Sequence, residues 1–350
     1  MIARRSTTIA PGYDIPRLIK GGWQLAGGHG AIDEATAIAD MQAFATAGIT
    51  AFDCADIYTG VEALIGQFLH RWRREQGPNA PAIRVHTKCV PDLDRLASLQ
   101  PTDITQLVER SRSRLGVDAI DLVQFHWWDY AIPGMIEAMQ QLATLRSEGL
   151  LREVGVTNMD TPHLSALLDA GVPIVTHQVQ VSLLDRRALR DMATLCRAHG
   201  VSLLAYGALA GGFFHERWHG VAAPSEPLEN RSLVKYRLMI DEFGGWDRFQ
   251  ALLDLLQQMA AARDTTIGTI ALRAVLDEPD VAAVIVGARH AGHLPATLAA
   301  LTLPAFTPAE RAALTALQQD APGPEGDVYT LERDRHGRHG AIMRYNLNRS

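Results

Sequence analysis

The sequence predicts an α/β fold, a (β/α)8 TIM barrel in which eight parallel strands alternate with helices. Short runs of β-type residues alternate with longer helical patterns from about residue 17 to about residue 320. The strand candidates number about eight, as a closed barrel needs. No Gly-x-Gly-x-x-Gly follows the first strand, so the pattern favours the barrel over an open, doubly wound sheet. The 350 residues are expected to form one barrel domain, with a core at about 17–320 and a tail at 321–350.

The predicted strands are short segments rich in β-branched and apolar residues, bounded by turn-forming residues. Helix-length segments separate them, as repeated strand–helix units require. In chain order they span residues 17–23, 50–54, 83–89, 120–126, 151–156, 173–179, 201–206 and 282–287.

The helices between the strands are indicated by apolar residues at three- and four-residue spacing and by capping residues at their ends. Polar side chains or proline begin such helices and glycine follows them, because these residues suit the free backbone groups at helix ends. The predicted boundary residues are Thr102 and Gly116, Pro133 and Gly149, Asp160 and Gly171, and a capping box of Thr307 and Glu310.

Two regions fall outside this repeat. Residues 207–246 form a long insertion after the seventh strand candidate and are rich in Gly, Trp and Phe. The tail from about residue 321 is irregular. Long loops on one rim of a barrel usually carry ligand contacts, so both regions are expected to lie near a binding site.

Charge and composition exclude several classes of function. The chain has 33 Lys+Arg against 39 Asp+Glu, a net charge of −6, so no basic surface favours binding to nucleic acid or to a membrane. No apolar stretch approaches the roughly 18 residues that span a bilayer. The three cysteines are widely spaced, and the N-terminus lacks the apolar segment of a signal peptide. A cytoplasmic protein is expected.

One short segment matches a metal-site pattern. In HERWH at 215–219, His215 and His219 would bind zinc and Glu216 would act as a base. That pattern needs a helix that places both histidines on one face, yet glycines closely precede and follow it. The match is interpreted as accidental, and no metal is predicted.

Polar side chains end three neighbouring predicted strands. Asp53 ends the second, Lys88 the third and His126 the fourth, and Tyr58 follows Asp53 by five residues. Reacting groups of α/β barrels lie at the C-terminal ends of strands, so these four side chains are expected to converge on one rim. Charged residues at strand ends are more often ion pairs, and a loop tyrosine is usually a packing residue. This set, however, is chemically coherent.

The four side chains suit protonation of the alkoxide that forms when a hydride reaches a carbonyl carbon. Tyrosine, with a pKa of about 10, is a poor acid near neutrality, but the ammonium of Lys88 is expected to lower the pKa of Tyr58. Asp53 would hold Lys88 charged and aimed. His126 would hydrogen-bond the carbonyl oxygen and steer it toward Tyr58.

The motifs around these residues resemble those of the aldo-keto reductases, (β/α)8 barrels that use a nicotinamide cofactor without a Rossmann domain. The resemblance covers most of the chain. FDCADIYTGVEALIGQFL places Asp53 and Tyr58 at the family's catalytic Asp and Tyr, TKC supplies Lys88, and DLVQFHWWD supplies His126. The resemblance implies an NAD(P)H-dependent oxidoreductase that reduces an aldehyde or ketone to the alcohol, with Tyr58 as the proton donor.

The same resemblance implies a cofactor site across the rim. LREVGVTNMD and HQVQVSLLDR place Thr157, Asn158 and Gln178 at the nicotinamide carboxamide, and Tyr206 would stack on the nicotinamide ring. The family's Ser-Pro-Leu after this tyrosine is Gly-Ala-Leu here, so backbone amides of the 209–213 loop are expected to bind the pyrophosphate. The expected cofactor-binding residues are Trp23, Thr157, Asn158, Gln178, Tyr206, Gly207, Leu209, Gly211, Phe213, Arg217, Gly287, Arg289, His293 and Thr297.

The expected cofactor preference rests on contacts to a 2′-phosphate. His293 stands where the family often has Arg or Gln, and Thr297 stands where it often has an adenine-contacting Asn. Arg217 and Arg289 are expected to clamp a 2′-phosphate. This favours NADP(H), with NAD(H) as the alternative.

Three tryptophans lie at or beside predicted strand ends. At least one of them is expected to be a core residue. As a hypothesis, Trp23, Trp127 and Trp128 are predicted to form the wall of an apolar pocket for a small-molecule carbonyl substrate, bulky or aromatic ones included. On this hypothesis Trp127→Ala raises KM for bulky carbonyls more than for small ones.

Two other functions use the same residues. Some relatives of the family keep the cofactor site and act as regulatory subunits, so the chain is alternatively a cofactor-binding subunit with little or no turnover. A Schiff-base aldolase on the same fold would use Lys88 as its nucleophile. That reading leaves Asn158, Gln178 and Tyr206 unexplained, and the four filled catalytic positions favour the reductase.

Overall fold

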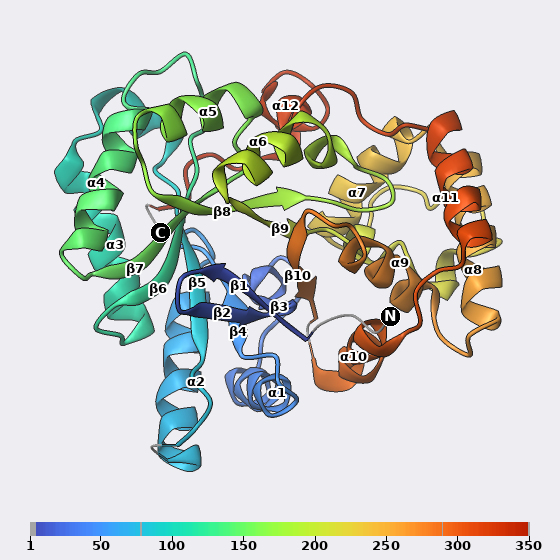
Figure 1. Cartoon of the computed structure of the whole chain (residues 1–350), viewed down its shortest axis with the longest axis horizontal. Helices are drawn as coiled ribbons and strands as arrows, with labels where there is room; N and C mark the ends of the chain where they lie inside the picture. The colour runs from blue at the N-terminus through green and yellow to red at the C-terminus, as the bar shows by residue number, and fades with distance from the viewer. Residues whose placement is uncertain (1–4, 78, 289, 349–350) are drawn as a thin grey trace.

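The computed structural model describes residues 5–77, 79–288 and 290–348, and its centre is a closed barrel of eight parallel strands (Figure 1). The strands follow one another around the barrel in chain order, and the last pairs with the first. This confirms the predicted fold class and all eight predicted strands. The barrel strands are β3 (Leu18–Gly21), β4 (Ala51–Asp53), β5 (Arg84–Cys89), β6 (Ile120–Phe125), β7 (Leu151–Thr157), β8 (Ile174–Gln180), β9 (Ser202–Tyr206) and β10 (Val281–Gly287).

Helices surround the barrel and cover the outward faces of its strands (Figure 1). The apolar stripes of most of these helices pack on the side chains that alternate outward along each strand. The helices are α1 (Glu34–Thr46), α2 (Val61–Gln76), α3 (Pro101–Leu115), α4 (Met135–Ser147), α5 (Thr161–Asp169), α6 (Asp191–His199), α7 (Arg231–Glu242), α8 (Trp246–Ala261), α9 (Ile267–Leu276), α10 (Leu294–Thr302), α11 (Pro308–Asp320) and α12 (Thr330–Arg333).

An antiparallel hairpin that the sequence analysis did not predict precedes the barrel. Its strands are β1 (Ser6–Ala10) and β2 (Tyr13–Pro16). Ile9 and Ile15 pack in one buried cluster with apolar side chains of the barrel interior, Leu122 among them. The hairpin therefore closes the end of the barrel at which the strands begin.

Two of the predicted helix starts are displaced by one or two residues. The helix expected from Thr102 begins at Pro101, because Gln100 is the N-cap and its backbone N–H is bonded by Asp103 at 2.8 Å. The helix expected from Pro133 begins after Gly134, which has a φ of +109°. The caps expected at Asp160 and at Thr307 with Glu310 are confirmed.

Inward-facing positions of the strands change from apolar to polar along the barrel axis. The part of the interior nearer the N-terminal ends of the strands holds apolar residues such as Ile19 and Leu204. Nearer the C-terminal ends, the buried inward positions are polar and include Asp53, Lys88 and Gln178. The alternation turns the intervening side chains outward, which is why Cys54 and Cys89 lie in the core between strands and helices.

The insertion at 207–246 is more ordered than its composition suggested. It contains α7, which packs with α8 and α9 in a second apolar core. The tail crosses the C-terminal rim, where Arg333 donates to the backbone oxygens of Trp127, Trp128 and Asn158. The tail is also tied to α7, because Arg338 pairs with Asp241 at 2.7 Å. Within the described ranges, no helix has both the length and the apolar character needed to cross a membrane.

Three buried histidines are expected to make the fold sensitive to acid. Burial lowers the pKa of His86, His126 and His177 to about 3, with nearby cations adding to the effect at the first two. The unfolded chain binds these protons from pH 6.5 downward and the folded chain does not, so the free energy of unfolding falls as pH falls. Burial of Asp56 acts in the opposite direction, because it raises the pKa of that carboxyl to about 8.

The net loss between about pH 7 and about pH 5 is expected to be roughly 3 kcal/mol, measured by urea unfolding at both pH values. His177→Gln should remove roughly 2 kcal/mol of that loss. His70→Gln, on an exposed helix face, is the matched control and should leave the loss unchanged. Equal or greater stability at about pH 5 would contradict this account, because it would mean that the histidines do not outweigh Asp56.

Candidate active site

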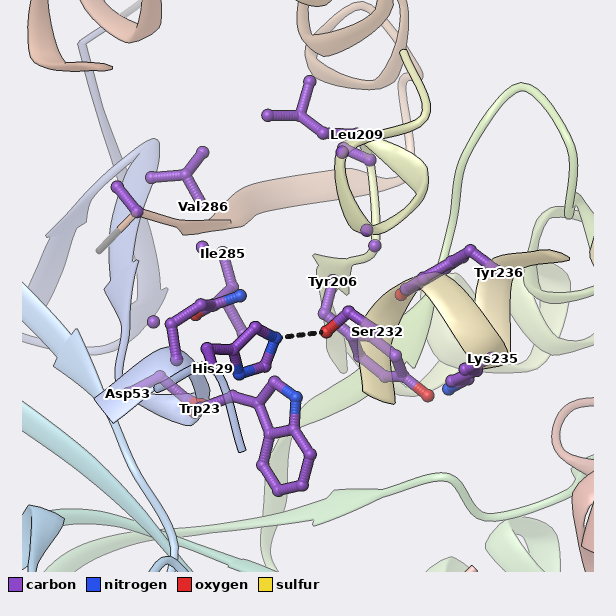
Figure 2. Close-up of a pocket in the computed structure, with 18 of the residues that line it drawn as sticks. Trp23, His29, Asp53, Tyr206, Leu209, Ser232, Lys235, Tyr236, Ile285 and Val286 are labelled. Atoms are coloured by element: carbon purple, nitrogen blue, oxygen red, sulfur yellow. Dashed lines mark hydrogen bonds between the residues drawn. The ribbon is translucent and has the colours of Figure 1, made fainter. Parts of the chain in front are cut away.

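A cavity of about 850 Å³ opens at the C-terminal ends of the barrel strands. Its wall combines the strand ends with the loop after β3, the first turns of α7 and the tail. Figure 2 shows His29 of that loop facing Ser232 of α7, and a hydrogen bond of 2.9 Å joins the two side chains. The cavity therefore lies between the barrel and segments outside the strand–helix repeat.

The structure brings Asp53, Lys88 and Tyr58 together at this cavity, as the sequence analysis expected. The Lys88 Nζ donates to Asp53 Oδ2 at 2.7 Å and to the backbone oxygen of Cys54 at 2.8 Å. The same Nζ lies 5.2 Å from the centre of the Tyr58 ring. The Asp53 Oδ1 accepts from Gln178 Nε2 at 2.6 Å and from Gln124 Nε2 at 3.2 Å. Asp53 is thus held by side chains from three other strands.

The protonation states of Lys88 and Tyr58 follow from burial and from each other. Burial disfavours the Lys88 ammonium, but the charge and hydrogen bond of Asp53, together with Tyr58 and Cys54, act against burial, and the pKa of Lys88 is raised to about 12. Burial raises the pKa of Tyr58, and the Lys88 ammonium acts against that rise without reversing it. The predicted effect of Lys88 thus has the expected direction, but burial exceeds it, and the net pKa of Tyr58 is raised rather than lowered. Tyr58 is a neutral phenol near neutrality, the form that can give a proton to an alkoxide.

His126 lies beside these groups as a neutral imidazole. Its Nδ1 is 3.1 Å from the backbone oxygen of Thr157, and because a carbonyl oxygen only accepts, the proton is assigned to Nδ1. Burial, with the charge of Arg333, lowers the pKa of His126 to about 3, so Nε2 carries no proton. In this tautomer His126 accepts a hydrogen bond from a hydroxyl. The expected donation from His126 to a carbonyl oxygen is corrected accordingly.

Aromatic rings form the wall around the reacting groups. The Trp23 and Tyr58 ring centres are 5.1 Å apart, and Trp128 lies edge-on to His126 at 4.4 Å. Both tryptophans line the cavity, as predicted from the sequence. Trp127 does not, because it is fully buried, its ring centre is 5.8 Å from that of Phe125, and its Nε1 donates to backbone oxygens. The prediction that Trp127 is a pocket residue is corrected.

The residues expected at the nicotinamide gather on one side of the cavity. Tyr206 donates to Asn158 Oδ1 at 2.8 Å, and Thr157 Oγ1 donates to the backbone oxygen of Gln178 at 3.1 Å. The Gln178 amide nitrogen is bonded to Asp53 and Gln124, which leaves its oxygen as the acceptor for a ligand. All four residues line the cavity.

The loop after β9 lies under α7, and this packing explains its glycines. Gly207, Leu209 and Gly211 line the cavity. A Cβ at Gly207 would lie 2.2 Å from the Tyr236 hydroxyl, and one at Gly211 would lie 2.6 Å from the Tyr236 ring. Both glycines also have positive φ. Phe213 is fully buried among Trp218, Trp246 and Phe249 away from the lining, which corrects its expected cofactor contact.

The far end of the cavity is formed by the segment after β10. Gly287, His293 and Thr297 line it, as expected. Arg217 does not, because its guanidinium stacks on Trp218 and pairs with Glu229 at 3.6 Å. Its predicted 2′-phosphate contact is corrected. Arg289 lies outside the described residues.

Several residues of the cavity, and one of the network behind it, were missed in the sequence analysis. Gln124 does not line the cavity but donates to Asp53, and strand alternation alone could have found this inward polar residue of β6. The others come from segments brought close only by the fold, with no local sequence signal. They are His29, Ser232, Lys235, Tyr236 and Tyr329.

The donor and acceptor groups of the wall fit a nicotinamide dinucleotide. Gln24 Oε1, His126 Nε2 and Trp128 Nε1 are buried cavity-wall atoms that lack a hydrogen-bond partner in the described residues. Buried polar groups of this kind are usually satisfied by a ligand or water. The cavity also has an aromatic face at Tyr206 and a backbone free of side chains at Gly212.

The HERWH segment has no metal-site geometry. Residues Glu216–Trp218 form a short 3₁₀ turn, and the side chain of Glu216 accepts from the backbone of Ile267 at 2.7 Å. His219 pairs with Asp254 at 2.8 Å. Across the described ranges, no three His, Cys, Asp or Glu side chains are grouped as metal ligands would be.

Comparison with known proteins places this geometry in one family. The family model described as "Aldo/keto reductase family" matches residues 17–319. The NADH-specific methylglyoxal reductase of Escherichia coli (strain K12) is 27% identical over 314 residues, which cover 83% of this chain and 90% of that protein. Flagellar radial spoke protein 5 of Chlamydomonas reinhardtii is 28% identical over 260 residues, which cover 64% of this chain. The match spans 49% of that protein, about half of its length.

The fold is shared with solved structures. The glycerol dehydrogenase from Gluconobacter oxydans superposes with a TM-score of 0.73 at 24% identity, covering 90% of this chain and 95% of that one. At this identity the likeness shows the fold.

Separate alanine substitutions of two neighbouring tryptophans test the aromatic wall of the cavity. Trp128→Ala should raise KM for bulky carbonyls about tenfold more than for small ones, because it removes a ring from the cavity. Trp127→Ala is the matched control. It should lower the free energy of unfolding by about 3–5 kcal/mol and leave the size preference unchanged. A larger change in size preference from Trp127→Ala would contradict the placement of these rings.

Proposed function

The chain belongs to the aldo/keto reductase family, and from that membership we propose that it reduces an aldehyde or ketone to the alcohol with NAD(P)H, using Tyr58 as the proton donor. The observation that carries the proposal is the buried Asp53–Lys88 pair beneath the Tyr58 ring, at the wall of a cavity large enough for a dinucleotide. A reduced nicotinamide, when bound, supplies the hydride.

Tyr58 completes the reaction by giving its proton to the alkoxide oxygen. An alkoxide is a much stronger base than a phenolate, so the neutral phenol can transfer its proton even though burial raises its pKa. Lys88, held charged by Asp53, stabilises the phenolate that remains. Tyr58 then recovers its proton from solvent.

His126 and the tryptophans orient the substrate. The unprotonated Nε2 of His126 accepts a hydrogen bond from the hydroxyl of the alcohol product, or of an alcohol substrate in the reverse direction. Trp23 and Trp128 exclude water from the reacting carbon. Asn158, Gln178 and Tyr206 would hold the carboxamide and the ring of a bound nicotinamide.

We propose NADP(H) as the preferred cofactor, with NAD(H) as the alternative. The pairing of Arg217 with Glu229 removes one of the two arginines behind this preference, and the other, Arg289, lies outside the described residues. The name of the Escherichia coli relative assigns NADH specificity to that protein, so the preference differs within the family.

The protonation and hydrogen bonds of Lys88 disfavour the hypothesis that the chain is a Schiff-base aldolase. A Schiff-base lysine must lose its proton to attack a carbonyl. The Lys88 ammonium is bonded to Asp53 and to a backbone oxygen, and its pKa is raised to about 12. A cytoplasmic location stays a proposal, supported by the three cysteines, which are buried free thiols.

Tyr58→Phe tests the proton donor. Loss of the phenolic hydroxyl should lower kcat by about 100- to 10,000-fold, because general acid catalysis is removed while the ring stays in place. NADPH binding, followed by quenching of tryptophan fluorescence, should be nearly unchanged. Tyr13→Phe is the matched control, since this hydroxyl bonds His86 at the opposite end of the barrel. Loss of both turnover and binding in Tyr58→Phe would indicate a structural role.

A further inference from the structure

Lys235 is a cavity residue that the proposed reaction does not use. It extends from α7 and lines the cavity, partly buried. Its Nζ lies 5.0 Å from the ring centre of Tyr206, 5.6 Å from that of Tyr236 and 5.9 Å from that of Tyr329. Figure 2 shows Lys235 beside Tyr206. Three aromatic rings therefore surround one ammonium group.

Lys235 differs from the other lysines of the chain in its hydrogen bonds. The sequence has three lysines among its 33 basic residues, at positions 20, 88 and 235. Lys20 and Lys88 are buried, and both donate to backbone oxygens. Lys235 makes no hydrogen bond or ion pair with any residue in the described part of the chain. An ammonium has three donors, so those of Lys235 are available to a molecule in the cavity.

The buried charged side chains near Lys235 are paired with one another and not with Lys235. Arg187 Nη2 lies 2.8 Å from Asp185 and 3.2 Å from Glu332, and all three side chains are buried. Burial lowers the pKa of Lys235, and the two carboxylates around the single guanidinium act against that lowering without reversing it. These carboxylates favour the ammonium form without occupying its hydrogen-bond donors.

Lys235 lies on the side of the cavity that holds the reacting groups. The Tyr329 ring that it faces is 5.6 Å from the His126 ring, centre to centre. His126 in turn adjoins Trp128. A molecule whose carbonyl meets Tyr58 can therefore extend past His126 toward Lys235, along Tyr329.

We propose that Lys235 binds an anionic oxygen group of the substrate, so that the chain prefers carbonyl compounds that also carry a carboxylate. The inference rests on the proposed reductase activity and names its substrate class. The Lys235 ammonium lies among three tyrosine side chains, where little water competes for it. A charge-assisted hydrogen bond from this ammonium to a carboxylate is therefore strong. The phosphates of the cofactor carry the same anionic chemistry, and the experiment separates the two sources.

The experiment compares matched pairs of aldehydes with the full chain and NADPH. Succinic semialdehyde is paired with its methyl ester, and para-carboxybenzaldehyde with its methyl ester. The ratio of kcat/KM for the acid to that for the ester should exceed one in the wild type. Lys235→Met should lower this ratio by about 10- to 100-fold, the effect of losing one charge-assisted hydrogen bond. Lys235→Arg should restore most of it.

Arg237→Met is the matched control, because it removes one positive charge from the same helix. Arg237 bonds to Asp241 of its own helix and does not line the cavity. This variant should keep the wild-type ratio. The affinity for NADPH should be unchanged by Lys235→Met.

Several results would overturn the inference. An equal fall for acid and ester would show that Lys235 only supports the fold, and a weaker affinity for NADPH in Lys235→Met would show that it binds a cofactor phosphate. Turnover of the esters with no preference for the acids would leave the reductase standing and remove the role of Lys235. Should no aldehyde be reduced, the proposed function fails. Calorimetric binding of acid and ester to wild type and Lys235→Met then decides the role of Lys235.

Discussion

The carboxylate of Asp53 is the contact on which the rest of the cavity depends. Its two oxygens accept hydrogen bonds from Lys88, Gln124 and Gln178, which belong to β5, β6 and β8. A carboxylate is stable in a barrel interior only when its oxygens are satisfied. The requirement therefore fixes three side chains from three strands, and breaking such a buried pair typically costs about 3–5 kcal/mol. The Asp53 carboxylate thus keeps Lys88 charged, and its hydrogen bond to the Gln178 amide nitrogen fixes the orientation of that side chain.

The barrel supplies the chemistry, and later segments shape the cavity around it. α7 lies over the glycines at 207 and 211, and the tail is held to the rim by Arg333. Arg231 of α7 in turn donates to the backbone oxygen of Ile342 in the tail, at 2.8 Å. Because α7 and the tail contact each other as well as the rim, a change in either segment reshapes the substrate side while leaving the Asp53 network intact.

Strand alternation explains most of what could be predicted from the sequence. Once the strands were located, the polar residues at their C-terminal ends had to face inward, which brought Asp53, Lys88 and His126 together. The same rule explains the error at Trp127. Phe125 faces outward and His126 inward, so the next residue turns outward again and Trp128 returns to the cavity.

The remaining differences come from long-range contacts. Nothing near Arg217 in the sequence indicates that Glu229 will pair with it, and nothing local places Tyr329 against His126. The net pKa of Tyr58 differs from the prediction for a related reason. The sequence showed the nearby ammonium, but the extent of burial, which raises the pKa, is a property of the whole fold.

The most direct test of this account is steady-state consumption of NADPH and NADH by the pure protein with a panel of aldehydes and ketones, run beside Asp53→Asn. The wild type should consume a reduced cofactor with at least one carbonyl. Asp53→Asn should lose turnover by about 100-fold or more, because Lys88 loses its carboxylate, and should still bind the cofactor. Full turnover in Asp53→Asn would contradict the account. So would a wild type whose tryptophan fluorescence is quenched by NADPH but which reduces no carbonyl.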